Sequence, residues 1–161
     1  MDRGKEENPK TESGRDKPSS QYSSRVKMHH IGILTSDIRS GIRHHEDLFD
    51  IHPITEIVED PIQKVSLVLL SGDQIPGTSI ELIQPLTGDS PVSNIIKRGM
   101  PLYHLCFEVE DVEKALEKTR ERGSIIISRP TPAKLYNGRR IAFIYTPDHY
   151  VVEFLEAEKI G

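Results

Sequence analysis

The stretch HHIGILTSDI, residues 29–38, opens with two adjacent histidines at the start of a short apolar run. Neighbouring side chains of an extended strand point to opposite faces, so His29 and His30 cannot have the same role. The stretch YHLCFEVEDV, residues 103–112, has the same layout, with His104 in the place of His30. Tyrosine replaces the first histidine there, so only the second one is repeated. The repeat therefore selects His30, and His29 is expected to hold a packing or edge position.

The order of elements repeats as well. Asp37 and Asp111 are separated by the same interval as the two repeated histidines, and each ends a strand-like run before a helical pattern. Both halves then read as strand, helix and three strands. Strands are expected at 28–34, 52–58, 64–70, 78–84, 102–109, 124–128, 139–145 and 149–156, and helices within 36–49 and 110–123. Matching residues inside a matching element order indicate an internal duplication.

Alternation along the first strand of each half sorts its residues into two faces. One face combines a histidine with a small residue, as if room were left beside the imidazole, in the pairs His30 with Gly32 and His104 with Cys106. The other face is mainly apolar and is expected to pack under the two helices; it carries His29, Ile31, Ile33, Tyr103, Leu105 and Phe107.

The last strand of each half carries a carboxylate between apolar neighbours, Glu81 in SIELIQP and Glu153 in VVEFLE. A charge enclosed on that face is costly unless it is paired or binds a metal. With His30 and His104 these carboxylates form a sufficient ligand set for one divalent ion, and mixed N and O ligands suit Co, Zn, Ni, Mn or Fe. The alternative is that all four are ordinary strand residues, structural or facing solvent. Their matching places in two repeats favour a shared metal site.

Composition limits the remaining classes of function. The chain has 161 residues and a net charge of −4. Residues 1–27 contain too few apolar side chains to fold and are expected to be a disordered tail, and residues 157–161 a short C-terminal tail. No basic stripe indicates a nucleic-acid partner, and no apolar run is long enough to span a membrane. The tail lacks the features of a signal peptide, and a single cysteine fits a reducing compartment, so we expect a cytoplasmic protein.

The order strand, helix and three strands, given twice with His…Glu…His…Glu, resembles the vicinal oxygen chelate superfamily over residues 28–156. That superfamily includes glyoxalase I, extradiol dioxygenases, bleomycin- and fosfomycin-resistance proteins and methylmalonyl-CoA epimerase. Three stretches are most similar to the epimerases: HHIGI at 29–33, IELIQPLTGDSPVSNIIKRG at 80–99 and YHLCFEVEDVEKALEKTRERG at 103–123.

The resemblance implies an α+β fold of two tandem βαβββ modules, residues 28–85 and 102–156, which form a cupped, half-open mixed sheet around one divalent metal ion. The family's metal positions fall on four residues of this chain: His30, Glu81, His104 and Glu153.

The resemblance also implies an epimerase or isomerase that removes a proton from the carbon next to a thioester carbonyl. Glu81 and Glu153 are the predicted proton carriers. Arg139 is a candidate contact for an anionic substrate, and Asn137 and Gln84 are polar candidates near the cup. The expected partner is an acyl-CoA or another small carbonyl compound, bound by a homodimer.

Two departures from the epimerase pattern leave other activities open. The strand at 64–70 has no acid where some epimerases carry a base, and TPDHYVVEF lacks a glycine pair common in epimerases. A glyoxalase I-like lyase fits the same ligands. An extradiol dioxygenase would not need Glu81. A binding protein of the bleomycin-resistance type would not need the metal ligands.

Overall fold

The computed structural model describes residues 26–159, so the predicted disordered tail lies almost entirely outside the described residues. Ten strands are present there: β1 (Lys27–Leu34), β2 (His52–Pro53), β3 (Val58–Asp60), β4 (Val65–Ser71), β5 (Ser79–Pro85), β6 (Leu102–Val109), β7 (Ile125–Ile126), β8 (Thr131–Pro132), β9 (Arg140–Tyr145) and β10 (Val151–Glu156). The helices are α1 (Ile38–Phe49), α2 (Ser93–Lys97), α3 (Val112–Arg120) and the 3-10 helix η1 (Lys134–Tyr136).

The predicted α+β fold with a duplicated element order is confirmed, with a few added short elements. The single strand expected at 52–58 is two short strands, β2 and β3, which both pair with β4. The second half divides in the same way, because β7 and β8 both pair with β9. The helix η1, between β8 and β9, was not predicted.

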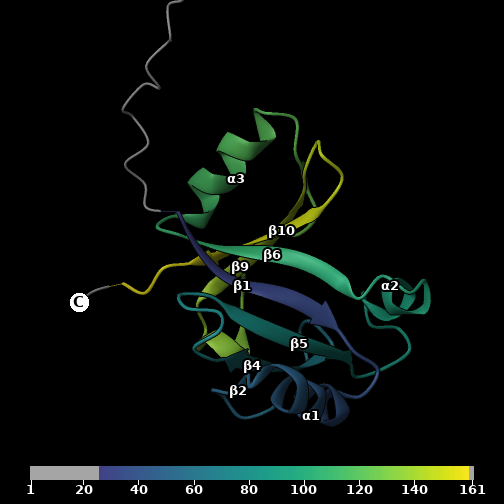
Figure 1. The fold of residues 1–161 in the computed structure, drawn as a ribbon. Helices are drawn as coiled ribbons and strands as arrows, with labels where there is room; N and C mark the ends of the chain where they lie inside the picture. Colours follow the sequence, from purple (N-terminus) through teal and green to yellow (C-terminus); the bar gives the residue numbers. More distant parts are fainter. Residues whose placement is uncertain (1–25, 160–161) are drawn as a thin grey trace, which may run out of the picture.

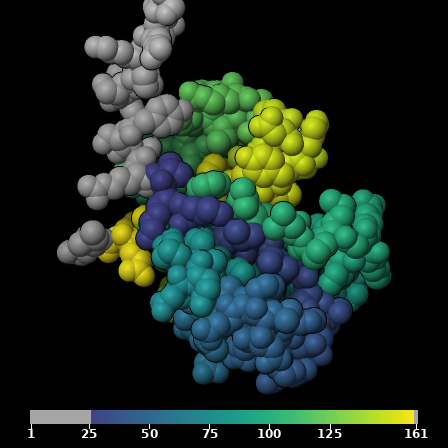
Figure 2. Space-filling model, in the orientation of Figure 1, coloured from purple at the N-terminus to yellow at the C-terminus, as the bar shows by residue number. Residues whose placement is uncertain are grey.

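All ten strands belong to one mixed sheet, whose main order is β2-β4-β5-β1-β6-β10-β9-β7. Within each half the first and last strands are parallel, β1 with β5 and β6 with β10. The halves join through the antiparallel pair β1 and β6, so the two modules share one sheet within one chain. The space-filling view shows the first module in blue and teal below the green and yellow second module (Figure 2).

One helix covers each half of the sheet (Figure 1). Asp37 caps α1 by accepting a hydrogen bond from the Ser40 amide, and Asp111 caps α3 in the same way. Ile38 of α1 packs with strand residues of the first module, Val68, Leu70 and Leu82. Val112 and Leu116 of α3 pack in the same way with Ile144, Val152 and Phe154 of the second module. Among the described residues, no helix is long and apolar enough to cross a membrane.

The β1–β6 pair has a register shift, a β-bulge, just before each of the two repeated histidines. Met28 pairs with Phe107 but His30 with Cys106, which leaves His29 as the extra residue. The register shifts again at Tyr103, just before His104. An extra residue resets the alternation of side chains.

The bulges make one expectation wrong. Ile33 and Phe107 lie beneath the helices as predicted, whereas His29 and Tyr103 do not follow them. The His29 ring contacts Tyr136, with the ring centroids 5.4 Å apart. Tyr103 lines a cavity on the ligand side of the sheet. Both residues that precede a ligand histidine therefore lie beside the ligands.

Candidate metal centre

The four central strands bring the four predicted metal ligands together. His30 comes from β1, Glu81 from β5, His104 from β6 and Glu153 from β10. All four are at most 3% exposed. One ligand atom from each lies within 4.8 Å of the others. Residues far apart in the sequence thus converge because parallel and antiparallel pairings place β5, β1, β6 and β10 side by side.

The distances within this cluster suit one ion. The Nε2 atoms of His30 and His104 are 2.9 Å apart, and Glu153 Oε2 lies 3.0 and 3.2 Å from them. Glu81 Oε2 lies slightly farther away, at 3.5 and 3.7 Å. Ligand atoms at right angles, each about 2.1 Å from a shared ion, are about 3.0 Å apart.

The unsatisfied polar atoms also fit a cation. Glu153 Oε2 is buried without a hydrogen-bond partner among the described residues, although the two imidazole nitrogens lie near it. A buried carboxylate oxygen is costly unless a donor or cation meets it. Two imidazoles and two carboxylates form a mixed N and O donor set for a divalent transition metal.

The electrostatics show how strongly the four groups depend on one another. Burial raises the pKa of Glu81 above its ordinary value. Burial alone would lower the pKa of His30, but Glu81 and Glu153 outweigh it and raise that pKa. Burial likewise opposes ionisation of Glu153, yet His104 and His30 hold the pKa of this carboxyl well below its usual range. Positive charge on the histidines and negative charge on the carboxylates thus stabilise each other in the buried cluster. A bound divalent cation would supply the positive charge in place of the protons.

Gly32 allows the close approach of one ligand. It lies opposite His104 across the β1–β6 pair. A Cβ atom at Gly32 would be 2.4 Å from Cε1 of the His104 ring. Cys106 stands opposite His30 in the same way. Gly32 and Cys106 were predicted to leave room for the histidine of their own strand. In the structure each of them lies opposite the histidine of the other strand.

The family model described as the Glyoxalase/Bleomycin resistance protein/Dioxygenase superfamily matches residues 29–143. The chain belongs to this superfamily.

Several relatives are named methylmalonyl-CoA epimerases. The chain is 22% identical to the ethylmalonyl-CoA/methylmalonyl-CoA epimerase of Cereibacter sphaeroides, covering 76% of this chain and 90% of the relative. It is 31% identical to the uncharacterized protein YqjC of Bacillus subtilis, covering 73% and 81%.

Solved structures share the fold. The methylmalonyl-CoA epimerase of Mycobacterium tuberculosis has a TM-score of 0.71 at 20% identity, covering 83% of this chain and 89% of that one. A methylmalonyl-CoA epimerase in complex with methylmalonyl-CoA and NH4+ has a TM-score of 0.71 at 18% identity, covering 84% and 96%.

Two further residues of this superfamily member touch the ligands and were not predicted to do so. The Tyr136 hydroxyl donates to Glu81 Oε1 at 2.7 Å and lies 3.1 Å from Nδ1 of His30. His29 Nδ1 lies 3.0 Å from the same His30 nitrogen. The repeat gave no signal for Tyr136, because the matching position of the first half is Ile62. For His29 the sequence did offer a signal, because it stands directly beside the candidate ligand His30.

The predicted substrate contacts lie away from the four ligands. Gln84 Oε1 accepts a hydrogen bond from the Ile38 amide at 2.7 Å, at the start of α1. Asn137 is exposed, in a left-handed turn after η1. Arg139 donates to the Glu108 carboxylate and to a backbone carbonyl. The structure does not bring these three residues to the ligand cluster, and their roles in substrate binding stay predictions.

A cavity of about 300 Å³ borders the cluster at Glu81 and His104. Its other walls are mainly apolar: Ile62, Gln63, Val65, Leu67, Ile83, Pro91, Val92, Tyr103, Ile127, Ser128, Thr131, Ile141 and Phe143. No lysine or arginine is among these lining residues. Concave, mainly apolar sites with a few convergent polar groups are typical of small-molecule binding.

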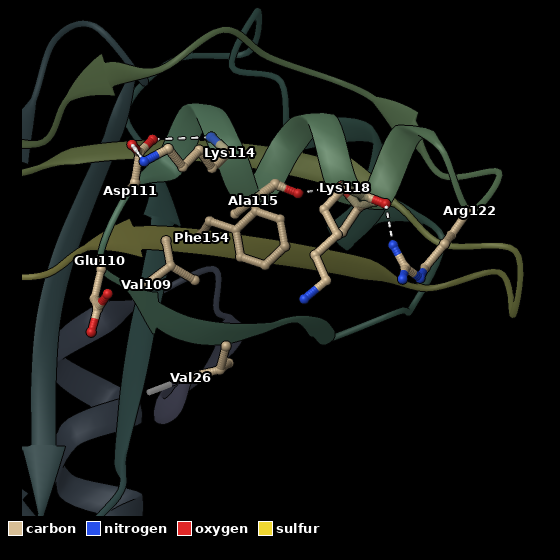
Figure 3. A pocket seen from close by; sticks show the side chains of 10 residues that line it. Val26, Val109, Glu110, Asp111, Lys114, Ala115, Lys118, Arg122 and Phe154 are labelled. Atoms are coloured by element: carbon tan, nitrogen blue, oxygen red, sulfur yellow. Dashed lines mark hydrogen bonds and ion pairs between the residues drawn. The ribbon is translucent and has the colours of Figure 1, made fainter. Parts of the chain in front are cut away.

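A second cavity, of about 380 Å³, lies beside α3 (Figure 3). Val109, Ala115 and Phe154 form its apolar part, and charged side chains such as Lys114 and Arg122 surround them. None of the four ligands borders it. The first cavity is therefore the one that combines space for a substrate with the candidate metal centre.

Proposed function

We propose that this protein is a metal-dependent isomerase that moves a proton at the carbon next to a thioester carbonyl, as its epimerase relatives do by name. The observation that carries this proposal is the buried cluster of two histidines and two glutamates beside an apolar cavity. Structural relatives that bind acyl-CoA ligands support the substrate class.

In this proposal His30, Glu81, His104 and Glu153 would hold one Co, Zn, Ni, Mn or Fe ion. A bound divalent ion would polarise the carbonyl oxygen and lower the cost of an enolate. The mainly apolar cavity walls lower the local polarity, which strengthens electrostatic interactions at the reacting carbon.

The carboxylates would carry the protons. Glu81 lines the cavity, so we assign to it the removal of the proton from the substrate carbon. The Tyr136 hydroxyl holds Oε1 of that carboxylate, which leaves Oε2 on the side of the other ligands. Epimerisation also requires proton return on the opposite face of the enolate, and Glu153 is the second proposed carrier.

Solvent deuterium exchange into methylmalonyl-CoA tests the proposal. The wild-type protein with one bound metal is expected to exchange the proton next to the thioester carbonyl. Glu81→Gln keeps an oxygen ligand but cannot accept the proton, so exchange should fall by at least about 100-fold, the usual contribution of a general base. A metal-loaded wild-type protein without exchange contradicts this substrate assignment.

A second candidate, a glyoxalase-type lyase, is favoured by the charge of the site. A divalent ion with two carboxylates and two neutral imidazoles has no net charge. Within residues 26–159, no lysine or arginine lines the cavity to balance a substrate carboxylate. β4 also offers no acid as an additional base. These features suit a substrate whose reacting carbon carries no carboxylate, such as the hemithioacetal of methylglyoxal with glutathione. Turnover of that pair, without exchange in methylmalonyl-CoA, would select this activity.

A non-catalytic binding protein of the same fold is the remaining alternative. Purified wild-type protein that binds no divalent metal would favour it over both enzymes. A cytoplasmic homodimer is part of the main proposal, and light scattering on the purified protein tests the dimer.

A further inference from the structure

The outer contacts of the ligand cluster are unequal between the two modules. His30 and Glu81, from the first module, have hydrogen-bonding neighbours behind them. His104 Nδ1, from the second module, is buried without a hydrogen-bond partner among the described residues. The four candidate ligands are arranged almost symmetrically, but the hydrogen-bonding neighbours outside the set are unequal between the two modules.

Tyr136 provides most of that support. The residue is 6% exposed, and its ring stacks on His30 at an interplanar angle of 10°. An ionised carboxylate only accepts hydrogen bonds, so the Tyr136 hydroxyl donates its proton to Glu81. Its oxygen remains able to accept from Nδ1–H of His30, 3.1 Å away. One hydroxyl can therefore orient two ligands.

His29 gives the same nitrogen a second neighbour. Its Nδ1 atom lies 3.0 Å from Nδ1 of His30, and its ring meets Tyr136 edge to face. A histidine that binds metal through Nε2 normally donates its other ring N–H to an acceptor, which fixes the orientation of the ring. His29 reaches this place because the bulge turns it to the ligand side.

The asymmetry arises from a position where the repeat diverges. Tyr136 belongs to the second module but contacts ligands of the first. Its counterpart in the first module is Ile62, an apolar residue that lines the cavity and cannot donate a hydrogen bond from its side chain. The buried carboxylate of Asp60 accepts from the Lys134 amide at 3.1 Å and so anchors η1, which carries Tyr136, to the first module.

We propose that Tyr136 and His29 are positioning residues that set the first-module half of the metal site, His30 and Glu81, before metal binds. In the second-module half, Nδ1 of His104 has no such partner among the described residues, so the ion itself orders this ring. This inference depends on the metal centre of the proposed function, and it assigns residues outside the ligand set that determine metal affinity.

Cobalt(II) binding to the purified chain tests the inference, with affinity measured by competition against a chelator and ligand geometry read from the visible absorption spectrum. Tyr136→Phe keeps the ring but leaves Glu81 Oε1 without its donor. Loss of such an outer partner typically costs about 10–100-fold in metal affinity. We expect a loss of this size and a changed spectrum. Tyr150→Phe is the control, since this tyrosine is 45% exposed and no hydrogen bond of its hydroxyl is found in residues 26–159, and it should bind cobalt as the wild type does.

His29 gives a second pair of variants that keeps the test independent of folding. In His29→Asn a side-chain oxygen can still accept from His30, whereas His29→Leu has no acceptor. Affinity retained in the first and reduced in the second would support a positioning role. Wild-type affinity and spectrum in both Tyr136→Phe and His29→Leu would overturn the inference while leaving the metal centre intact. Failure of the wild-type chain to bind cobalt would instead contradict the proposed function.

Discussion

Gly32→Ala is expected to disrupt the metal centre without touching a ligand. The added Cβ atom would lie 2.4 to 2.6 Å from three atoms of the His104 ring. Ordinary contacts begin at 3.4 Å, so the ring would have to retreat by about 1 Å. His104 is 3% exposed, and a buried ring on a central strand has little room to move. A functional ligand must be held within about 0.5 Å of its place, so this displacement is sufficient to misplace it.

The magnitude follows from the cost of overpacking. Inserting a methyl group into a close-packed interior costs about 1–3 kcal/mol. If the His104 ring moves away to relieve the clash, metal binding must return it to the strained position, and the cost of the strain is subtracted from the binding free energy. About 1.4 kcal/mol corresponds to a factor of ten in affinity. Zinc affinity of Gly32→Ala should therefore fall by about 5- to 150-fold. If the ring does not move, the metal-free protein should lose the same free energy of unfolding.

Chelator competition and thermal denaturation of the metal-free protein together measure both outcomes. Gly88→Ala is the matched control, because a Cβ atom there meets nothing within 4 Å. It should leave both affinity and stability within the range of an ordinary surface substitution, about 0.5 kcal/mol. Wild-type zinc affinity combined with wild-type stability in Gly32→Ala would refute the proposed contact between Gly32 and the ligand ring.

Three other predictions concern the ligands and the core. Elemental analysis should find about one divalent metal per wild-type chain and none in His104→Ala, which removes a ligand of the four-residue set. The pKa of His30 is raised in the folded protein, so protonated His30 stabilises the metal-free protein at pH values below about 6.5, the pKa in the unfolded chain. This stabilisation is lost as the pH rises through the pKa of the folded state, so the melting temperature of the metal-free protein should fall over that range. The stabilisation that zinc provides should grow over the same range, because zinc binds the neutral imidazole. The raised pKa of Glu81 acts in the same direction, and a melting temperature that instead rises over this range would contradict the assigned electrostatics. Leu70→Ala, at a fully buried site under α1, should cost about 2–5 kcal/mol of unfolding free energy in urea denaturation, against about 0.5 kcal/mol or less for exposed Leu48→Ala.

The repeat was sufficient to predict the element order and to group the four candidate ligands, and the family resemblance supplied the cupped sheet that they share. Matching positions in the two halves occupy matching strands, and pairing of β1 with β6 brings the halves together. Glu81 and Glu153 each stand between apolar residues that pack under a helix, so alternation alone puts their carboxylates on the other face. The sorting of these side chains into two faces needed only periodicity and spacing.

Other features were not predictable in this way, because they depend on local geometry. Alternation put His29 on the helix face, but one extra residue in β1 turns it to the ligands. A bulge leaves no reliable mark in the residues around it. Gln84 occupies the helix side of β5, where its amide oxygen meets the start of α1. Tyr136 lies in a 3-10 helix of three residues, which is too short to show a hydrophobic periodicity in the sequence.

The positions where the two modules differ are the ones that can distinguish the two faces of a bound substrate. A twofold-symmetric arrangement of two histidines and two glutamates would present the same environment to both faces of an enolate. Here the Tyr136 hydroxyl donates to Glu81, whereas Glu153 interacts with the Cys106 thiol. The counterpart of Tyr136, Ile62, has no side-chain donor. Glu81 also borders the cavity, and Glu153 is not among its lining residues. The two carboxylates are thus chemically distinct although they occupy equivalent strands, and a difference of this kind is what separate roles as first and second proton carrier require. The duplication therefore accounts for the four candidate ligands, and its divergence accounts for the separate roles proposed for the two carboxylates.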